Sequence, residues 1–429
     1  MMSPRASTIC PGLLAGVGAW LAYDALAAGS LGRYQIVGCA LGAALALPFV
    51  SIVLLRDRAR RFWRRVLFAA VPLGALLLAT ELGVRLFGPE PERPGVLLPD
   101  TRLGHRNEPF TEGTDARGFR NATALERTDV LFVGDSQTWG FGVGRDATFA
   151  ALLHQATGQA TYQMANGSWG PVQYVELVRQ GLALRPRHVV VTVYLGNDLV
   201  DAHDYAGLDG AEALRSPGVA YTVRDNPEFH PQRAPNVAMA LVDGVLDRSR
   251  VLGFAARVVK SRLQGGALDR GPGDLAFDSV PALATILRPS YRMPAVDPTR
   301  SGVRDGIAVT ERALAAIAAA CRTAAPASEP VLVVLPTKEF VYANWATRRQ
   351  APIAGLDAIL AAERTTHAAV MAAGNAAGMR TIDLAPLLGD ALDRGEAPWP
   401  ASGDGHLNAA GHTLVAKALA AIVRRRQRQ

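Results

Sequence analysis

The sequence predicts an α/β domain with a parallel sheet, preceded by three apolar helices. From residue 130 onward, short apolar runs alternate with longer segments of helical periodicity, which is typical of a parallel sheet covered on both faces. Three long apolar stretches precede residue 88. Polar motifs follow several of the apolar runs, at the strand ends where parallel sheets gather their ligands.

Five apolar runs are the expected strands, because each is short enough for a buried strand. They are Val130–Val133, Tyr162–Ala165, His188–Leu195, Pro330–Leu335 and Met379–Leu384. Helical periodicity predicts helices at Thr148–Thr157, Val172–Leu184, Ile307–Ala324, Ile353–Ala377 and, finally, Ala409–Arg424. Residues 201–300 are rich in Pro, Asp, Gly and Arg and contain one expected helix, Val237–Arg262. We interpret them as an insertion and a candidate cap over the substrate site.

The N-terminal apolar segments are Ile9–Ala28, Ile36–Leu55 and Val66–Phe87. Each approaches the roughly 20 residues that a membrane-spanning helix needs. The first could instead be a cleaved signal peptide, since Ala-Leu-Ala-Ala resembles a cleavage site. Six arginines lie between the second and third segments, and arginine-rich loops stay in the cytoplasm. We therefore expect a multi-pass protein of a bacterial inner or plasma membrane, with its main domain extracytoplasmic or periplasmic.

The expected organisation is an anchor at residues 1–87, a Pro-rich linker and lead-in at 88–127, and a catalytic domain at 128–429. The net charge of +7 comes largely from the arginine loop and the C-terminal tail. Aromatic and basic residues do not alternate, which argues against nucleic acid as a partner. The three cysteines indicate no disulfide framework and no zinc spacing.

The motif Gly134-Asp135-Ser136 follows the first expected strand. A strand that ends in a tight turn exposes the next hydroxyl at the sheet edge, beside the free N–H groups of a helix N-terminus. Ser136 is therefore a candidate nucleophile whose own N–H could hold an oxyanion. The alternative is a turn in which Asp135 or Ser136 only caps a helix.

Three downstream motifs favour the nucleophile. His406 can accept the serine proton, and Asp404 can orient the imidazole. The N–H groups of Ser136 and Gly170 and the side-chain amide of Asn197 are candidate oxyanion donors. Gly167 competes with Gly170 for that role, and we favour Gly170 from its place in the loop.

These residues resemble the four motifs of the GDSL, or SGNH, hydrolase superfamily. Its serine, glycine, asparagine and histidine correspond to Ser136, Gly170, Asn197 and His406. One departure is that a single residue, rather than two, separates Asp404 from His406. The resemblance implies a flavodoxin-like three-layer α/β/α domain that hydrolyses or transfers esters without a cofactor. A Pro-Thr-Lys-Glu block at Lys338 and Glu339 recurs in the subset that this chain resembles, and we assign it no role.

The expected function is a membrane-tethered serine esterase acting on acyl esters, acetyl esters included, of envelope or secreted glycans. The alternatives are a lipid esterase, an O-acyltransferase that modifies a polysaccharide with a membrane acyltransferase partner, and a non-catalytic binding protein. A metal site at Asp201, His203 and Asp204 is disfavoured, because polar residues in a loop are more often simply solvated.

Overall fold

The computed structural model describes residues 95–223 and 273–425, together with residues 66, 72–73, 75–84, 86–87, 249, 251–252 and 271. Two compact units divide the chain. One comprises Met1–Pro91 and His230–Ala267, and the other comprises Glu92–Phe229 and Leu268–Gln429. The second unit contains all the residues of the candidate active site.

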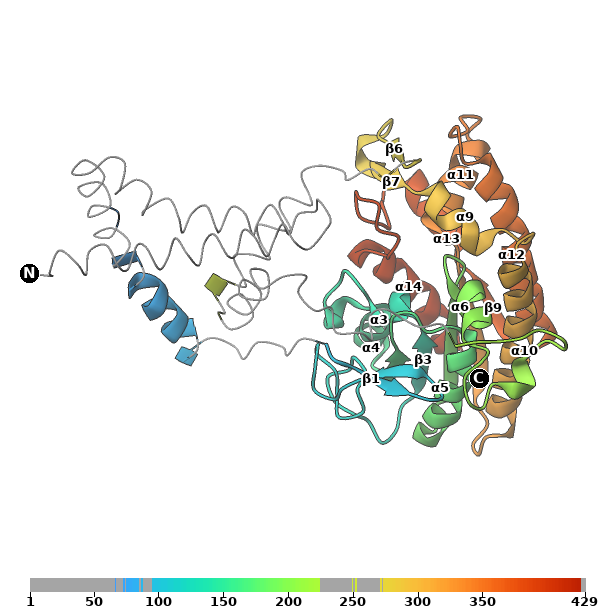
Figure 1. Ribbon diagram of the computed structural model, residues 1–429, viewed down its shortest axis with the longest axis horizontal. Helices are drawn as coiled ribbons and strands as arrows, with labels where there is room; N and C mark the ends of the chain where they lie inside the picture. The colour runs from blue at the N-terminus through green and yellow to red at the C-terminus, as the bar shows by residue number, and fades with distance from the viewer. Residues whose placement is uncertain are drawn as a thin grey trace, which may run out of the picture. The chain divides into compact units, whose positions relative to one another are not determined.

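A five-stranded parallel sheet forms the centre of the second unit (Figure 1). In spatial order its strands are β4 (Thr161–Ala165), β3 (Val130–Gly134), β5 (His188–Tyr194), β8 (Glu329–Leu335) and β9 (Arg380–Asp383). Renumbered along the chain, this is the order 2-1-3-4-5 of flavodoxin-like folds, whose switch point lies between the first and third strands. Here that point lies between β3 and β5. The expected α/β domain with a parallel sheet is confirmed.

Alternate side chains of the strands enter two separate hydrophobic cores. Val130 and Phe132 of β3 belong to one core, and Leu131 and Val133 belong to the other. This follows from the two-residue period of a strand, which sends successive side chains to opposite faces. Burial of each such side chain contributes roughly 1.5–3 kcal/mol. The apolar runs in the sequence therefore stabilise both interfaces of a three-layer domain.

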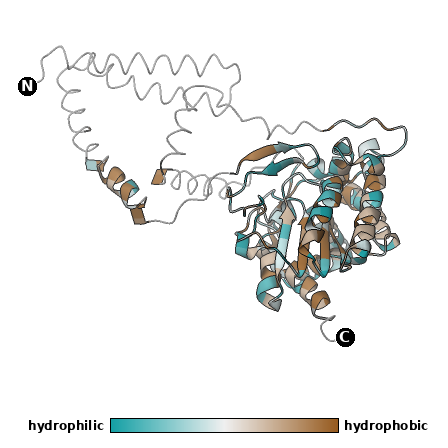
Figure 2. Ribbon diagram, turned by 90° about the horizontal axis from the view of Figure 1, so that it is seen from below, coloured by the Kyte–Doolittle hydropathy of each residue, from teal (hydrophilic) through white to brown (hydrophobic). Residues whose placement is uncertain are grey.

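Helices cover both faces of the sheet (Figure 1). One core takes in α4 (Phe149–Thr157), α11 (Lys338–Arg348), α13 (Ala385–Asp393) and α14 (Ala409–Arg425). The other takes in α5 (Pro171–Gly181), α6 (Asp198–Asp204) and α10 (Ser301–Thr323), while α12 (Asp357–Ala376) contributes to both. Figure 2 shows hydrophobic ribbon at the centre of this unit and hydrophilic stretches on its outer helices.

Shorter elements complete the unit. Two antiparallel hairpins pair β1 (Leu97–Asp100) with β2 (Gly104–Asn107) and β6 (Leu275–Phe277) with β7 (Thr285–Leu287). The helix α3 (Ser136–Trp139) follows β3, and α9 (Pro289–Val296) precedes α10. Short 3-10 turns occur at Arg145–Ala147, Leu182–Leu184, Glu212–Leu214 and Pro281–Leu283. The helix expected within the insertion, Val237–Arg262, lies almost wholly outside the described residues.

The expectation of three membrane-spanning helices requires correction. Residues 9–28 and 36–55 lie outside the described residues. A span needs about 20 consecutive apolar residues in one helix, and none of the helices in the described part of the chain has the length and apolarity to cross a membrane. In the third segment, the Glu81 carboxylate accepts hydrogen bonds from the Ser249 hydroxyl (2.9 Å) and the Val251 N–H (3.0 Å). The expected multi-pass location in a membrane depended on these three segments, and the described helices do not support it either.

Candidate active site

The turn after β3 is fixed by residues close together in the sequence. Gly134 ends the strand, and a Cβ at that position would collide with the Thr138 side chain. Asp135 caps α3, because its Oδ1 accepts a hydrogen bond from the Gln137 N–H at 2.9 Å. Ser136 is thus the first residue of α3, where the backbone N–H groups have no partner within the helix.

Ser136, His406 and Asp404 form a continuous hydrogen-bonded chain. His406 Nδ1 lies 2.7 Å from Asp404 Oδ1, and His406 Nε2 lies 2.9 Å from Ser136 Oγ. An ionised carboxylate can only accept, so Nδ1 carries the ring proton and Nε2 accepts from the serine hydroxyl. A weaker alternative acceptor for that hydroxyl is Asp135 Oδ2, at 3.3 Å.

Asp404 is held in its ionised form. Burial alone would raise its pKa, but the side-chain and backbone hydrogen bonds from His406 outweigh that effect and lower the pKa to about 2. The His406 backbone N–H donates to Asp404 Oδ1 at 3.0 Å, in addition to the ring contact. Asp404 therefore fixes both the orientation and the tautomer of the imidazole.

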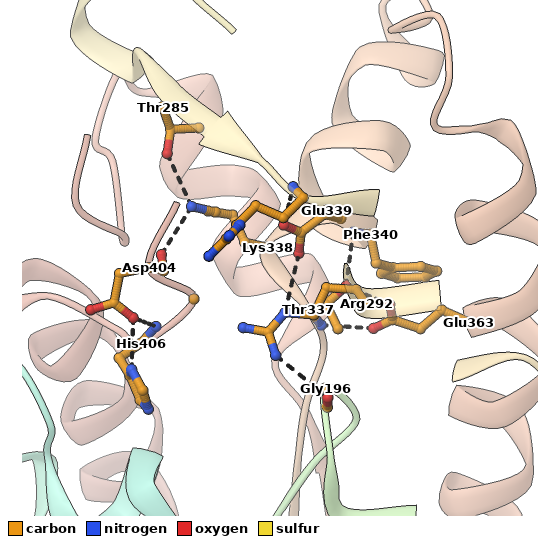
Figure 3. Close-up of polar contacts among 12 residues, drawn as sticks. Gly196, Thr285, Arg292, Thr337, Lys338, Glu339, Phe340, Glu363, Asp404 and His406 are labelled. Atoms are coloured by element: carbon orange, nitrogen blue, oxygen red, sulfur yellow. Dashed lines mark hydrogen bonds and ion pairs between the residues drawn. The ribbon is translucent and has the colours of Figure 1, made fainter. Parts of the chain in front are cut away.

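The loop that carries Asp404 and His406 is tied to distant elements by Gln137 and Lys338. Gln137 Nε2 donates to the Gly405 carbonyl at 3.0 Å, and its Oε1 accepts from the Leu407 N–H at 3.1 Å. Lys338 Nζ, buried at the start of α11, donates to three acceptors, of which Figure 3 labels Thr285 and Asp404. These are the carbonyls of Ser402 (2.7 Å) and Asp404 (2.9 Å) and the Thr285 hydroxyl (3.1 Å).

This geometry gives the Pro-Thr-Lys-Glu block a physical role. Lys338 holds the loop from Ser402 to His406, called the histidine loop below. Burial lowers the pKa of the Lys338 ammonium to about 8. Thr337 caps α11 and binds Glu363 through both its N–H and its hydroxyl. Burial raises the pKa of Glu363 to about 8. Gln137 carries no sequence signal, because its partners lie some 268 positions away.

Asn197 follows β5 and lines the same cleft as Ser136 and His406. Its side-chain Nδ2 donates to Asp201 Oδ2 at 2.6 Å, and the second proton of this amide has only a long contact of 3.5 Å with Asp198 Oδ1. Beneath it, the buried Asp198 accepts from the Tyr194 N–H (2.9 Å) and the Tyr174 hydroxyl (3.0 Å). Asp198 therefore braces the turn that presents Asn197.

Gly170 is placed differently from the other predicted residues. Its N–H donates to Gln173 Oε1 at 3.1 Å as α5 begins, while Gly167 and Ser168 line the cleft. The Gly167 N–H donates to Asn166 Oδ1 at 2.8 Å. The structure thus brings Ser136, Asn197 and His406 to one cleft and engages the Gly170 N–H within its own turn.

A cleft of about 940 Å³ lies over these residues. Phe141 forms one wall, and its ring centroid lies 5.5 Å from that of His406. Tyr291 and Arg292 of α9 line it as well, together with the start of α10. Its lining mixes aromatic, charged and hydroxyl groups, which suits a polar substrate.

Two of the three residues considered as metal ligands, Asp201 and His203, bind other side chains instead. Asp201 binds Asn197, and His203 Nδ1 lies 2.8 Å from Asp305 Oδ2. Within residues that the structure describes, no group of three or more histidine, cysteine or acidic side chains is arranged to hold a metal ion.

Comparisons with known proteins come only from solved structures, since neither a family model nor a curated protein matches the sequence. A G-D-S-L family lipolytic protein from Desulfitobacterium hafniense matches at 12% identity with a TM-score of 0.32, over 69% of this chain and 99% of that one. One from Veillonella parvula matches at 12% identity with a TM-score of 0.30, over 69% and 98%.

A carbohydrate esterase of family 2 from Corynascus thermopiles matches at 13% identity with a TM-score of 0.28, over 70% of this chain and 66% of that one. At these scores the residues of the site, rather than the likeness, decide what the chain can do. Among the matched structures are thus lipolytic proteins of the G-D-S-L family, the family whose four motifs this sequence resembles.

Proposed function

We propose that this chain is a serine ester hydrolase of the GDSL kind. The observation that carries the proposal is the hydrogen-bonded chain from Ser136 Oγ through the His406 ring to Asp404. A serine hydroxyl is a weak nucleophile unless a base lies within hydrogen-bond reach, and the base needs a third group to orient it. His406 is the base and Asp404 the orienting group, although both lie 268 or more positions after the serine in the sequence.

In the proposed reaction, Ser136 Oγ attacks the ester carbonyl carbon while its proton moves to His406 Nε2. The carbonyl electron pair moves onto oxygen, and the Ser136 N–H and the Asn197 amide donate to that oxyanion. Collapse expels the alcohol, which takes the proton from His406. Water then repeats the sequence on the acyl-serine and releases the acid.

Two features support an acyl ester of a glycan as the substrate. The cleft has a volume several times that of a small ester, so it can hold a sugar beside the acyl group. Its aromatic side chain Phe141, which is 40% exposed, offers a face on which a sugar ring can lie. The Gly170 N–H joins the oxyanion donors in this proposal only when Gln173 releases it.

The same cleft supports a second candidate, O-acyl transfer to a sugar hydroxyl in place of water. Its size leaves room for an acceptor next to the acyl-serine. Mass spectrometry of products formed with and without an acceptor glycan distinguishes the two. Free acid with no acylated glycan would eliminate the transferase.

The test of the hydrolase is the rate of 4-nitrophenyl acetate hydrolysis by the full chain and its Ser136→Ala variant. We expect kcat to fall by a factor of order 10³ or more, as for other triad nucleophiles. A fluorophosphonate probe should label the parent and not the variant. Ser301→Ala is the matched control, because it removes another hydroxyl from the same cleft and should keep both rate and labelling. Equal hydrolysis by parent and Ser136→Ala would show that Ser136 is not the nucleophile.

A further inference from the structure

Arg292 is a largely buried cation in the wall of the cleft. It lies on α9, and only 12% of its side chain is exposed. Its guanidinium lies beside Gly196 and Gly405, which immediately precede Asn197 and His406. Arg292 therefore lies between the two loops that carry a proposed oxyanion donor and the proposed base.

The hydrogen-bonding capacity of this guanidinium is poorly used. Nη1 lies 3.5 Å from the Gly196 carbonyl, and Nε lies 3.9 Å from Glu339 Oε2. Both separations reach or exceed the limit of a hydrogen bond, although a guanidinium has five N–H donors. Glu339 cannot close on it freely, because its Oε1 accepts from the Arg288 N–H at 2.8 Å.

The outer nitrogen, Nη2, points away from Glu339 and Gly196, toward the side on which Asp404 and His406 lie (Figure 3). A Cβ built on Gly405 would collide with this nitrogen. The glycine between Asp404 and His406 thus keeps the space that the guanidinium occupies. That gives the choice of glycine at position 405 a structural reason.

The plane of the guanidinium is set by two aromatic rings. Its carbon lies 5.5 Å from the Tyr194 ring centroid and 5.1 Å from that of Tyr291. Contacts of this kind attract a cation and restrict its orientation. A planar fork held in place is well suited to bind a carboxylate through two parallel hydrogen bonds.

We propose that Arg292 determines specificity by binding a carboxylate of the substrate, so that the chain prefers esters with an anionic group close to the scissile bond. The proposal rests on the hydrolase activity proposed above. A carboxylate would supply the short, charge-assisted hydrogen bonds that the guanidinium lacks among its protein partners. It would also lie beside the loops of Asn197 and His406, which places the ester next to them.

Two pairs of esters test the proposal on the full chain. 4-Acetoxybenzoate and its methyl ester differ in charge on the alcohol side, and mono-4-nitrophenyl succinate and 4-nitrophenyl pentanoate differ on the acyl side. For at least one pair, Arg292→Gln should lower the ratio of kcat/KM for the anionic over the neutral ester by roughly 10-fold to 100-fold. Arg292→Lys should lie between, because an ammonium keeps the charge but not the fork.

The pair that responds identifies the side of the ester that carries the carboxylate. Arg304→Gln is the control, since it removes an exposed arginine of α10 that does not line the cleft, and its ratios should match those of the parent. Ratios that Arg292→Gln leaves unchanged in both pairs would overturn the proposal. An equal fall for neutral and anionic esters would also overturn it, because that result indicates a positioning role.

A binding measurement separates this proposal from the hydrolase itself. In a Ser136→Ala background, calorimetry should show the responding anionic ester binding roughly tenfold more weakly when Arg292→Gln is added. Affinity that is independent of Arg292, for both anionic esters, would overturn the carboxylate site. Arg292-dependent binding without hydrolysis by the parent would instead retain the carboxylate site and refute the hydrolase.

Discussion

The two halves of the candidate active site are held in different ways. The turn at Gly134–Ser136 is fixed by its own neighbours, through the Asp135 cap and the close approach of Thr138. The loop from Ser402 to His406 forms no regular element and is fixed by side chains from α3 and α11. Gly134 and Asp135 are buried and Ser136 is half-buried, whereas the Asp404 side chain is 46% exposed and the His406 side chain is 30% exposed.

The difference indicates where the geometry of the site is vulnerable. A 2.9 Å contact between Ser136 and His406 joins a locally determined hydroxyl to an imidazole whose position depends on remote hydrogen bonds. Proton transfer needs this contact to stay within hydrogen-bond reach. Substitutions that free the histidine loop should therefore lower turnover without touching a reacting atom, whereas the nucleophile turn should tolerate conservative changes.

Among variants that leave the Ser136–His406–Asp404 chain intact, the largest effects are expected at Gln137, where Gln137→Ala removes the α3 side chain that binds the backbone of the histidine loop. The Gly405 carbonyl and the Leu407 N–H would lose their partner inside the protein. Each such loss costs about 1–3 kcal/mol, so we expect lower unfolding free energy by denaturation and kcat reduced by roughly tenfold or more.

Gln137→Glu sharpens the test, because it keeps the acceptor for the Leu407 N–H but places a carboxylate oxygen against the Gly405 carbonyl at a buried position. Its kcat should fall at least as far as that of Gln137→Ala, because a buried charge without a partner costs more than a lost hydrogen bond. Parent-like turnover in both variants would show that the loop is held without Gln137.

The same contrast explains what the sequence could reveal. The sheet was predictable, because runs such as Val189–Val193 are apolar enough to be buried on both faces. That Ser136, Asn197 and His406 lie in one cleft was predictable from their motifs, the first two of which directly follow strands β3 and β5. Gln137 and Arg292 were not, because their roles arise from partners brought close only by the fold. Lys338 was noticed without a role for the same reason.

One sequence interpretation was wrong for a physical reason, and a second, the choice of Gly170 as an oxyanion donor, stays a prediction. Apolar composition suggested membrane spans, but composition alone does not guarantee one long apolar helix, and the described part of the chain contains none. The loop pattern favoured Gly170, but it could not show that the Gln173 side chain would take the Gly170 N–H.

Lys338→Met should have the next largest effect. It removes the donor to the Ser402 and Asp404 carbonyls while keeping a side chain of similar length. We expect kcat for 4-nitrophenyl acetate to fall severalfold with little change in KM, because the loop that carries the base shifts while Lys338 itself does not line the cleft. A change confined to KM would contradict a positioning role for Lys338.

The pH dependence of the unfolding free energy provides a second test of Lys338→Met. Burial lowers the pKa of Lys338 to about 8, and lysine in an unfolded chain titrates near ~10.4. Between these values the unfolded state binds more protons, so the unfolding free energy rises with pH. The parent should therefore gain stability relative to Lys338→Met from pH 8 to about pH 10.4, by at most ~3 kcal/mol. A difference that stays flat over that range would contradict the lowered pKa.

Asp135→Asn should have the smallest effect on turnover and tests the locally determined half. Burial raises the pKa of Asp135 to about 6, although the hydrogen bond from the Gln137 N–H acts in the opposite direction. Between about pH 4 and pH 6 the folded state binds more protons than the unfolded state, so the parent loses stability as pH rises through this range. Asparagine carries no charge and keeps an oxygen that can cap α3.

Circular dichroism melts of the two proteins should therefore diverge from pH 4 to pH 6, with Asp135→Asn the more stable by at most ~3 kcal/mol at neutral pH. Turnover should change by less than about threefold, because Ser136 Oγ lies closer to His406 Nε2 (2.9 Å) than to Asp135 Oδ2 (3.3 Å). A large loss of kcat would mean that the Asp135 carboxylate takes part in moving the serine proton. The locally held half of the site would then depend on charge as strongly as the histidine loop depends on its remote hydrogen bonds.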